Sequence, residues 1–385
     1  MNISDQNCGC SNTNALVSIT GMEGKQKSCQ APADESFPSA VFNRKFIRGT
    51  IQTPAGPIPQ IATQWDASDY LGAVQVRWGI RRNNYRVDPG LYAVGTPNEY
   101  SDVLVTANYK LTFDIVRKNL NGLNVWLLIL DTKGVNVWCA AGKGTFGTNE
   151  LVQKIQSTSL DKIVIHRRLI LPQLGAVGVA AHLVKESSGF TVHFGPVRAS
   201  DIQLFIHSRY KTTKEMRHVN FNFYDRLKLI PTDLRNNLLY YAPLLVLFFI
   251  LSGIHADGIS IRQALSSLLP LVKILTAAYI AGVVLTPLLL PYIPVRSFSL
   301  KGYILGAVVA MLFFFTHSIG STLLAQAGGF FLISGFSSFL AMNFTGASTF
   351  TSLAGVKKEM RIAVPIQIAS GVIAAILVVL HTLIT

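Results

Sequence analysis

Charged side chains are scarce in this chain of 385 residues. Asp, Glu, Lys and Arg make up 14% of it, against roughly 25% in an ordinary soluble domain. The shortage is concentrated in residues 238–385, which hold 7 basic and 2 acidic side chains. This distribution excludes a disordered chain, argues against a wholly soluble protein and predicts a membrane-embedded C-terminal part.

Cysteine is also rare, and four copies exclude a disulfide scaffold in a chain of this length. Cys8, Cys10 and Cys29 lie near the start of the sequence, whereas Cys139 stands alone. The first residues have neither a basic n-region nor an apolar h-region, so no secretory signal peptide is predicted. We therefore expect the N-terminal part to fold in the cytoplasm with its thiols reduced.

Long apolar runs dominate residues 238–385. A helix needs about 20 apolar residues to cross the hydrocarbon core of a bilayer. Runs of about this length predict an all-α transmembrane domain of five helices, at Leu238–Ile254, Leu268–Leu290, Tyr303–Gly320, Gly328–Gly346 and Ala363–Ile384.

Lys and Arg are unevenly distributed between the segments that connect these spans. The segment before the first span and the loops after the second and fourth spans carry most of them. Because positively charged loops stay inside, we predict a cell (inner) membrane protein whose N-terminal domain is cytoplasmic and whose C-terminus is outside. The basic stretch Arg209–Arg235 ends at a span, so membrane lipid, and no nucleic acid, is its expected partner.

The N-terminal part divides in two. Residues 1–63 are rich in Ser, Gly, Pro and Asn without periodicity, and we predict a poorly ordered tail. In residues 64–237, strand-like apolar runs alternate with helical patterns from Asp102 onward. The predicted strands are 102–108, 124–130, 161–166 and 190–195, and the predicted helices are 109–120, 149–159, 175–187 and 201–210. This alternation predicts a parallel sheet with right-handed crossovers, an α/β Rossmann-like domain.

Ligands of such sheets bind outside the carboxyl ends of the strands. The loop after the second predicted strand contains NVWCAAGKGTFGT. Asn136 is a suitable N-cap for a short helix over residues 137–141, which Gly142 would end. Cys139 then lies in the first turn, where backbone N–H groups and the helix dipole favour a thiolate. Two small alanines beside it are expected to leave a flat surface that suits a planar metal complex.

The segment NVWCAAGK (Asn136–Lys143) resembles the signature of the corrinoid protein of microbial mercury methylation. PGLYAVG (Pro89–Gly95), VLVTANYKLTFD (Val103–Asp114) and FGPVRASD (Phe194–Asp201) fit the same family. A cytoplasmic domain followed by five spans fits as well, so the resemblance covers residues 64–385. LPQLGAVGVAAHLVKESSGF and GPVRA also resemble the corrinoid-carrying subunit of the acetyl-CoA pathway.

The resemblance implies that residues 64–237 form a corrinoid-binding domain, with a cobalamin-type corrinoid and its cobalt as cofactor. It implies that the helix of the motif covers the lower face of the corrinoid, and that the Cys139 thiolate is the lower axial cobalt ligand and the catalytic residue. The further corrinoid contacts that it implies are Thr106, Thr112, Asn136, Trp138, Lys143, Gly144, Thr145 and Ala199.

In activity, the resemblance implies a methyltransferase that passes a methyl group from methyl-cobalt(III) corrinoid to mercury(II), forming methylmercury. A methyl-folate-type donor system would supply the methyl group. Thiolate donation to cobalt would favour departure of the methyl with its electron pair. A ferredoxin-like protein with 4Fe–4S clusters is the implied electron donor, because four cysteines do not credibly hold such a cluster here.

Two other functions stay open on the sequence. One is a corrinoid methyl carrier of the acetyl-CoA pathway, which would deliver its methyl group to a carbonyl-forming enzyme. The other is a membrane metal transporter or sensor that binds soft metals through Cys139. Corrinoid bands in the visible absorption spectrum of the purified protein separate the two corrinoid functions from the third.

The charge asymmetry of the loops predicts an odd number of spans. A reporter that is active only in the cytoplasm should therefore be silent when it is fused after Thr385. The same reporter fused in the loop that carries Arg296 and Lys301 should be active, which controls for expression. Strong activity of the Thr385 fusion would mean an even number of spans.

Overall fold

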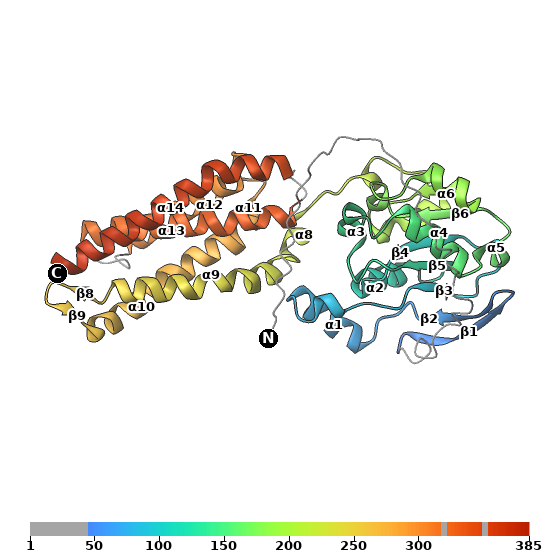
Figure 1. Cartoon of the computed structure of the whole chain (residues 1–385), viewed down its shortest axis with the longest axis horizontal. Helices are drawn as coiled ribbons and strands as arrows, with labels where there is room; N and C mark the ends of the chain where they lie inside the picture. The colour runs from blue at the N-terminus through green and yellow to red at the C-terminus, as the bar shows by residue number, and fades with distance from the viewer. Residues whose placement is uncertain (1–44, 317–321, 349–352, 385) are drawn as a thin grey trace, which may run out of the picture.

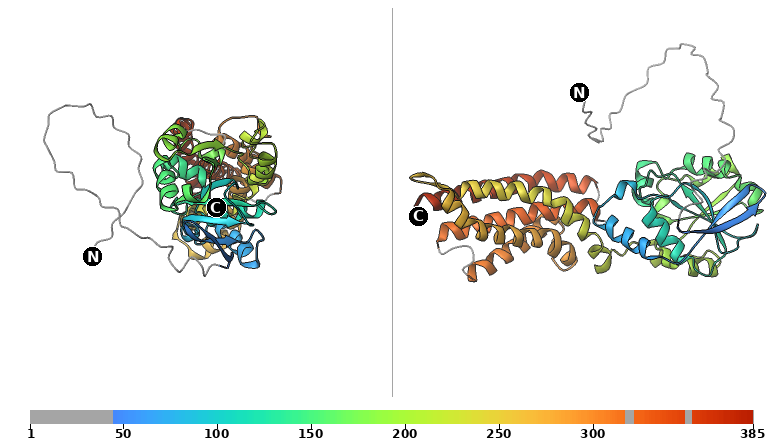
Figure 2. Two further views of the ribbon diagram at one scale, coloured as in Figure 1. Left: turned by 90° about the vertical axis from the view of Figure 1, so that its right-hand side faces the viewer. Right: turned by 90° about the horizontal axis from the view of Figure 1, so that it is seen from below.

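The computed structural model describes residues 45–316, 322–348 and 353–384. They form a mixed α/β sheet domain and a helical region, which lie end to end along the long axis of the molecule (Figure 1). The two further views of Figure 2 show the same arrangement. The predicted features at Cys8, Cys10 and Cys29 and the predicted span end at Gly320 lie outside the described residues.

The sheet domain has a seven-stranded sheet in the order β1-β2-β3-β5-β4-β6-β7. Its strands are β1 (Ile47–Thr53), β2 (Gly56–Ile61), β3 (Gly90–Val94), β4 (Val103–Ala107), β5 (Val125–Leu130), β6 (Arg168–Leu171) and β7 (Thr191–Phe194). Its α-helices are α1 (Ala67–Arg77), α2 (Lys110–Asn119), α3 (Val137–Lys143), α4 (Thr148–Ser157), α5 (Leu160–Ile163), α6 (Ala181–Ser188) and α7 (Ile202–His207). Short 3₁₀ turns lie at Arg82–Asn84, Gln173–Gly175, Ala199–Asp201 and Glu215–Arg217.

The strands β4, β5, β6 and β7 form a run of parallel pairs, as the alternation of strands and helices predicted. After β4 the chain crosses to β5 on one side and then returns to β6 on the other side of β4. The strand order therefore reverses at β4, which creates a topological switch point. The sheet as a whole is mixed, because β3 runs antiparallel to β5 and β1 pairs antiparallel with β2.

Two predictions about the strands of the sheet were wrong. The predicted tail extends too far, because β1 and β2 form a hairpin closed by Gly56, whose φ of +107° favours glycine. The third strand was placed on residues 161–166, but Leu160–Ile163 is helical and the strand is β6. Leu160 and Ile163 are buried at the i, i+3 spacing of a helix face, which the run of apolar residues concealed, and Val164, also buried, follows α5 with an extended backbone.

Helices cover both faces of the sheet. Val103 and Val105 of β4 point into a core formed with α3, α4, α5 and α6. Leu104, between them, points into a second core formed with α2 and α7. The alternation follows from the two-residue period of a strand. Two cores meet at β4, so the carboxyl end of this strand is reached by side chains from α2 and from α3.

A buried cluster of charges joins α1 to α2. The Arg117 guanidinium of α2 is fully buried and donates to Asp69 of α1 at 2.5 Å and to Asp114 at 2.9 Å. It also donates to the carbonyl oxygens of Ala62 and Gln64, at 2.7 and 2.9 Å. These bonds satisfy most of its donors and fix the chain that leads into α1 against α2.

Lys110 completes the cluster by donating to Asp69 at 2.8 Å and to Asp114 at 2.6 Å. Burial alone would raise the pKa of Asp69. The hydrogen bonds from Lys110, from the backbone of Asp66 and from Arg117 outweigh burial, so the pKa of Asp69 lies below its usual value. The carboxylate is thus held in its charged form beside its two cations.

Within the described residues, the helical region contains five helices long and apolar enough to cross a membrane, as predicted. They cover Ile230–Leu251, Ile261–Leu289, Phe298–Phe315, Leu323–Gly346 and Ala354–Ile384. Their elements are α9 (Ile230–Leu251), α10 (Ile261–Ile280) with the π-helical η6 (Ala281–Leu285) and α11 (Thr286–Leu289), α12 (Phe298–Phe315), α13 (Leu323–Asn343) with a 3₁₀ turn (Phe344–Ala347), and α14 (Leu353–Ile384). The short α8 (Phe223–Leu227) precedes them, and a two-stranded hairpin, β8 (Ile254–His255) and β9 (Gly258–Ile259), follows α9.

The boundary between the two parts lies inside a helix. The first span was predicted from Leu238, whereas α9 begins at Ile230, with Pro231 in its first turn. Proline is well placed there because the first N–H groups of a helix have no partner within it. Residues 230–237 therefore extend the first candidate span toward the sheet domain as continuous helix.

The helices α12 and α13 pack unusually closely. A Cβ atom at Gly306 would lie 2.7 Å from the Ser334 Cα, and one at Gly302 would lie 2.4 Å from the Ala341 Cβ. The Ser337 hydroxyl donates to the Gly302 carbonyl at 2.8 Å. Small residues allow this backbone approach, which is how helices associate in lipid.

The buried charge cluster generates a stability prediction. Arg117→Leu leaves Asp69 and Asp114 with one cation, and breaking such a buried pair costs about 3–5 kcal/mol. The midpoint of thermal unfolding of the sheet domain should fall strongly, measured on the full chain in detergent. Lys118→Leu is the matched control, because Lys118 is exposed and should matter by no more than about 1 kcal/mol. Equal midpoints for the two variants would contradict this account of the cluster.

Candidate functional site

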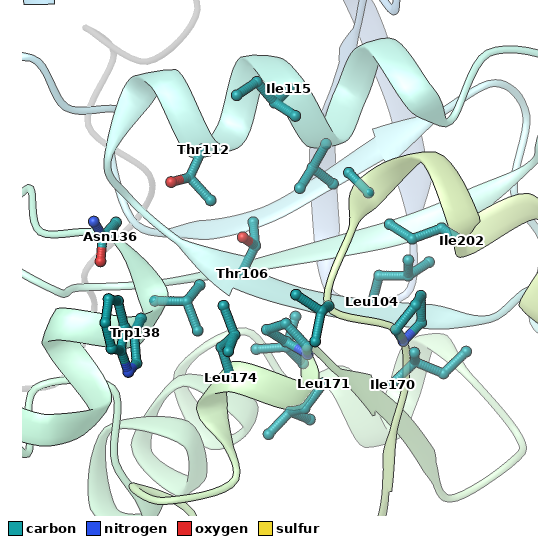
Figure 3. Close-up of a pocket in the computed structure, with 17 residues that line it drawn as sticks. Leu104, Thr106, Thr112, Ile115, Asn136, Trp138, Ile170, Leu171, Leu174 and Ile202 are labelled. Atoms are coloured by element: carbon teal, nitrogen blue, oxygen red, sulfur yellow. The ribbon is translucent and has the colours of Figure 1, made fainter. Parts of the chain in front are cut away.

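A cavity of about 300 Å³ lies at the carboxyl edge of the sheet, at the switch point between β4 and β6 (Figure 3). This is where ligands of open α/β sheets bind, and the volume is at the lower end for small-molecule sites. The lining residues come from β4, α2, α3, β6 and the segment after β7: Leu104, Val105, Thr106, Thr112, Ile115, Val116, Asn136, Val137, Trp138, Ile170, Leu171, Pro172, Leu174, Pro196, Val197, Ala199 and Ile202.

Most of the wall is apolar, and few polar groups reach the cavity. The hydroxyl of Thr106 is buried and has no hydrogen-bond partner among the residues that the structure describes. In Figure 3, Thr106 and Thr112 bring their hydroxyl oxygens to the same side of the cavity, with Asn136 nearby. Leaving a buried hydroxyl without a partner destabilises a protein by about 1–3 kcal/mol. The Thr106 hydroxyl in this wall is therefore available to bond a ligand.

Asn108 determines where α3 begins. This residue directly follows β4, is buried, and its Oδ1 accepts from the backbone N–H groups of Thr132 and Gly134, at 3.1 and 3.0 Å. Its Nδ2 donates to Asp131 at 3.0 Å. The carboxyl end of β4 thereby holds the turn that follows β5, and α3 starts beside the switch point as a consequence.

The helix α3 carries the cysteine motif. As predicted, the Asn136 side chain caps it, accepting from the backbone N–H of Cys139 at 2.9 Å. The helix ends at Gly144, with φ +81°, and not at Gly142 as predicted. The two alanines after Cys139 do not provide an outer flat surface. Ala140 and Ala141 are buried, because they face the core beneath α3.

The core beneath α3 explains one glycine nearby. A Cβ atom at Gly178 would lie 2.2 Å from the Phe146 carbonyl oxygen and 3.0 Å from the Ala141 Cα. Any other residue there would push away α3 or the turn that ends it. The predicted helix over residues 175–187 is accordingly replaced at its start by a 3₁₀ turn, and α6 begins at Ala181.

The cavity brings together five of the nine predicted cofactor contacts: Thr106, Thr112, Asn136, Trp138 and Ala199. Cys139, also predicted as the metal ligand, is exposed on α3 next to Trp138, but it does not line the cavity. Lys143, Gly144 and Thr145 do not line it either. Lys143 is the last residue of α3 and Gly144 is its C-cap. Thr145 follows, and its backbone N–H donates to the Ala140 carbonyl oxygen at 3.0 Å.

Sequence reasoning missed much of the apolar wall. Ile115 and Val116 of α2 and Ile202 of α7 line the cavity, as do prolines after β6 and β7. Pro172 and Pro196 follow the carboxyl ends of their strands, so strand position was the signal that could have found them. The α2 and α7 residues carry no such signal, since an apolar side chain in a helix is ordinarily assigned to the core.

Comparison with known proteins shows that this domain is similar to subunits of acetyl-CoA synthase complexes, and that the chain is similar to a corrinoid/iron-sulfur protein. Residues 66–206 match the family model described as CO dehydrogenase/acetyl-CoA synthase delta subunit. The chain is 33% identical over 127 residues to the acetyl-CoA decarbonylase/synthase complex subunit gamma of Methanopyrus kandleri, covering 32% of this chain and 27% of that protein. It is 34% identical over 122 residues to the corrinoid/iron-sulfur protein large subunit of Moorella thermoacetica, covering 31% and 27%.

A longer match is to the gamma subunit of Methanocaldococcus jannaschii, with 31% identity over 159 residues, 40% of this chain and 32% of that protein. The chain thus spans between a quarter and a third of the length of these relatives. The similarity relates residues 66–206 to subunits of the CO dehydrogenase/acetyl-CoA synthase complex. The matched family region ends at residue 206, before the five apolar helices of the described residues.

Proposed function

We propose that this chain is a membrane-anchored corrinoid protein of methyl transfer, with the corrinoid held at the switch point of its sheet domain. The observation that carries the proposal is the cavity itself. Five residues chosen from sequence as corrinoid contacts line one cavity, within residues 66–206, which match the CO dehydrogenase/acetyl-CoA synthase delta subunit model, and the chain is also similar to a corrinoid/iron-sulfur protein.

The residues of the cavity suit a corrinoid. The macrocycle is broad and apolar with polar groups at its edge, and the cavity offers an apolar wall with the unpartnered Thr106 hydroxyl at one side. Thr106 and Thr112 would hydrogen-bond the edge of the cofactor, and Ala199 would contact it beside β7. Trp138, 44% exposed, would be covered by the ring and exclude water from it. When bound, the cofactor supplies cobalt chemistry, in which the metal accepts a methyl group and releases it.

We assign Cys139 the role of lower axial ligand. The Asn136 cap orders the first turn of α3, so the cysteine is presented from a fixed backbone. Its neighbour Trp138 lines the cavity, and Cys139 itself is exposed on the same helix. A thiolate that donates electron density to a metal favours loss of a ligand with its electron pair. This is the direction of transfer that a soft cationic acceptor requires.

For the methyl acceptor, we propose mercury(II) as substrate, on the resemblance of the Asn136–Lys143 segment and on the exposed thiol. A methyl-folate-type donor system and a ferredoxin-like electron donor belong to this proposal. A second candidate is a methyl carrier of the acetyl-CoA pathway, and the comparisons favour it more directly, because the relatives are subunits of that pathway. The decisive experiment loads the protein with an isotopically labelled methyl group and offers it mercury(II) or a carbonyl-forming enzyme. The acceptor that removes the label identifies the reaction.

Thr106→Val tests the cofactor site. The variant removes a hydroxyl that has no partner in the described part of the chain, so the unfolding midpoint without corrinoid should stay equal or rise. Corrinoid should bind up to about tenfold more weakly, since one hydrogen bond contributes about 1 kcal/mol. Thr132→Val is the control, because the Thr132 hydroxyl bonds Asn108 Oδ1 at 2.8 Å and the Val135 carbonyl at 2.6 Å. This control should lower the midpoint. Unchanged corrinoid affinity in Thr106→Val would place the cofactor elsewhere.

Cys139→Ala tests the axial ligand. Alanine favours a helix and keeps the backbone N–H that Asn136 accepts from, so α3 should persist and corrinoid should remain bound. The cobalt absorption spectrum should change, and methylmercury formation should fall to background. Cys139→Thr should behave alike, because a neutral hydroxyl is a poor donor to cobalt.

Other roles of this cysteine give different results. A structural cysteine would lose corrinoid content and stability together in Cys139→Ala. A mercury-capturing cysteine would be partly replaced by added thiol-bound mercury. An unchanged spectrum with unchanged methylmercury formation would refute the axial ligand.

A further inference from the structure

The helix α1 has a second apolar face, on which Tyr70 contacts Trp65 and Lys118 while Leu71, Val74 and Trp78 remain exposed in the described part of the chain. Its inner face packs on the sheet domain through Gly72, Ala73 and Val76, which are buried. The opposite face and the turn that follows it expose large apolar side chains: Tyr70 (53%), Leu71 (59%), Val74 (52%), Trp78 (43%) and Ile80 (44%). Residues 70, 71, 74 and 78 fall within one side of a helix at 100° per residue. An exposed apolar face opposite the buried one indicates that α1 binds something besides the sheet domain.

The end of α1 is tied to the start of the first candidate span. The Thr232 hydroxyl of α9 donates to the Arg77 carbonyl oxygen at 2.6 Å, and Arg235 donates to the Trp78 carbonyl oxygen at 3.4 Å. Leu238, where the apolar run of α9 begins, lies six residues after Thr232, about 9 Å along the helix. In Figure 1 and in the right-hand view of Figure 2, α1 lies at the end of the helical region that faces the sheet domain. This is the level at which a bilayer would end.

Aromatic side chains mark the same level elsewhere. Tyr224 of α8 is 68% exposed and Tyr292, which follows α11, is 75% exposed. The two elements are held together, since Arg226 of α8 donates to the Leu288 carbonyl oxygen of α11 at 3.2 Å. Exposed tyrosine and tryptophan at the ends of spans are typical of the interface between lipid and water.

Basic residues surround the C-terminal end of α1. Arg77 lies in its last turn, Arg81 and Arg82 follow in the exposed turn, and Arg235 approaches from α9. Asp233 is the acidic side chain near them and faces Arg82. The excess of positive charge suits the head groups of anionic lipids.

We infer that α1 lies in the plane of the cytoplasmic membrane surface and inserts Leu71, Val74 and Trp78 among the lipid head groups. Such helices bury their apolar face about 5–10 Å deep, with cations at the head-group level. The contact would fix the sheet domain at a second point besides α9. Because Asp69 of α1 is bonded to Lys110 and Arg117 of α2, and α2 lines the cavity with Thr112, the lipid contact also supports one wall of the candidate site. This inference requires α9 to cross a membrane, and it does not depend on the corrinoid.

The test places a polarity-sensitive fluorophore at Val74→Cys in the full chain, with the four native cysteines replaced. The protein is reconstituted in vesicles of phosphatidylcholine and phosphatidylglycerol. The emission should shift to shorter wavelength, and nitroxide-labelled lipid should quench it several-fold more strongly than a fluorophore at Gln156→Cys. Gln156 is exposed on α4, on the other side of the domain, and is the matched control. Adding Leu71→Glu should abolish the quenching at residue 74, and omitting phosphatidylglycerol should weaken it.

Two results would overturn the inference. Emission at residue 74 that equals the water-exposed control would show an uncovered helix face. Emission that is shifted equally in detergent and in vesicles, without quenching by labelled lipid, would show that protein covers α1, either another segment of this chain or a second copy.

Discussion

The position of β4 between β5 and β6 is the constraint on which the candidate site depends. The connection from β4 to β5 and the connection from β5 to β6 run in opposite directions along the sheet, and Thr106, near the carboxyl end of β4, faces a cavity at this point. The side chain of Asn108, one residue beyond β4, then ties the turn after β5 to the same point. The strand order creates the cavity, and the Asn108 side chain positions the start of α3 at its border. The cysteine motif is thereby carried to the cavity by interactions in which the cysteine itself takes no part.

The general architecture could be predicted from the sequence because it depends on periodicity. Continuous apolar runs such as Val125–Leu130 become strands buried on both faces, and the five long apolar segments become helices. The cap at Asn136 was predictable because capping is local chemistry. Periodicity gave no information on β1, β2 and β3, which lie upstream of the regular alternation. It also misassigned residues 161–166, where tertiary packing selects a helical turn.

The site was predictable in part for a related reason. Residues at strand ends, such as Thr106 and Ala199, could be found because parallel strands place their carboxyl ends together. The direction in which a side chain points from the seven-residue helix α3 could not be predicted in this way. Whether Cys139 or Trp138 faces the cavity depends on how α3 rests on the core through Ala140 and Ala141, and that orientation is not encoded in spacing alone. The positions of Ile115 and Val116 in the cavity wall could not be predicted, because apolar side chains line a cavity wall and fill a core alike.

The end-to-end arrangement of the sheet domain and the helical region restricts the directions from which a binding partner can reach the cavity. The carboxyl edge of β4 to β7 lies toward the helical region, since α3 follows β5 and is found at that end of the domain (Figure 1). A protein partner cannot approach along the long axis of the molecule, because the bundle of helices occupies it. Small ions are not restricted in this way. A large partner must approach the sheet domain from the side. A partner that is itself attached to the membrane would diffuse only in the membrane plane, at the same distance from the bilayer as the cavity.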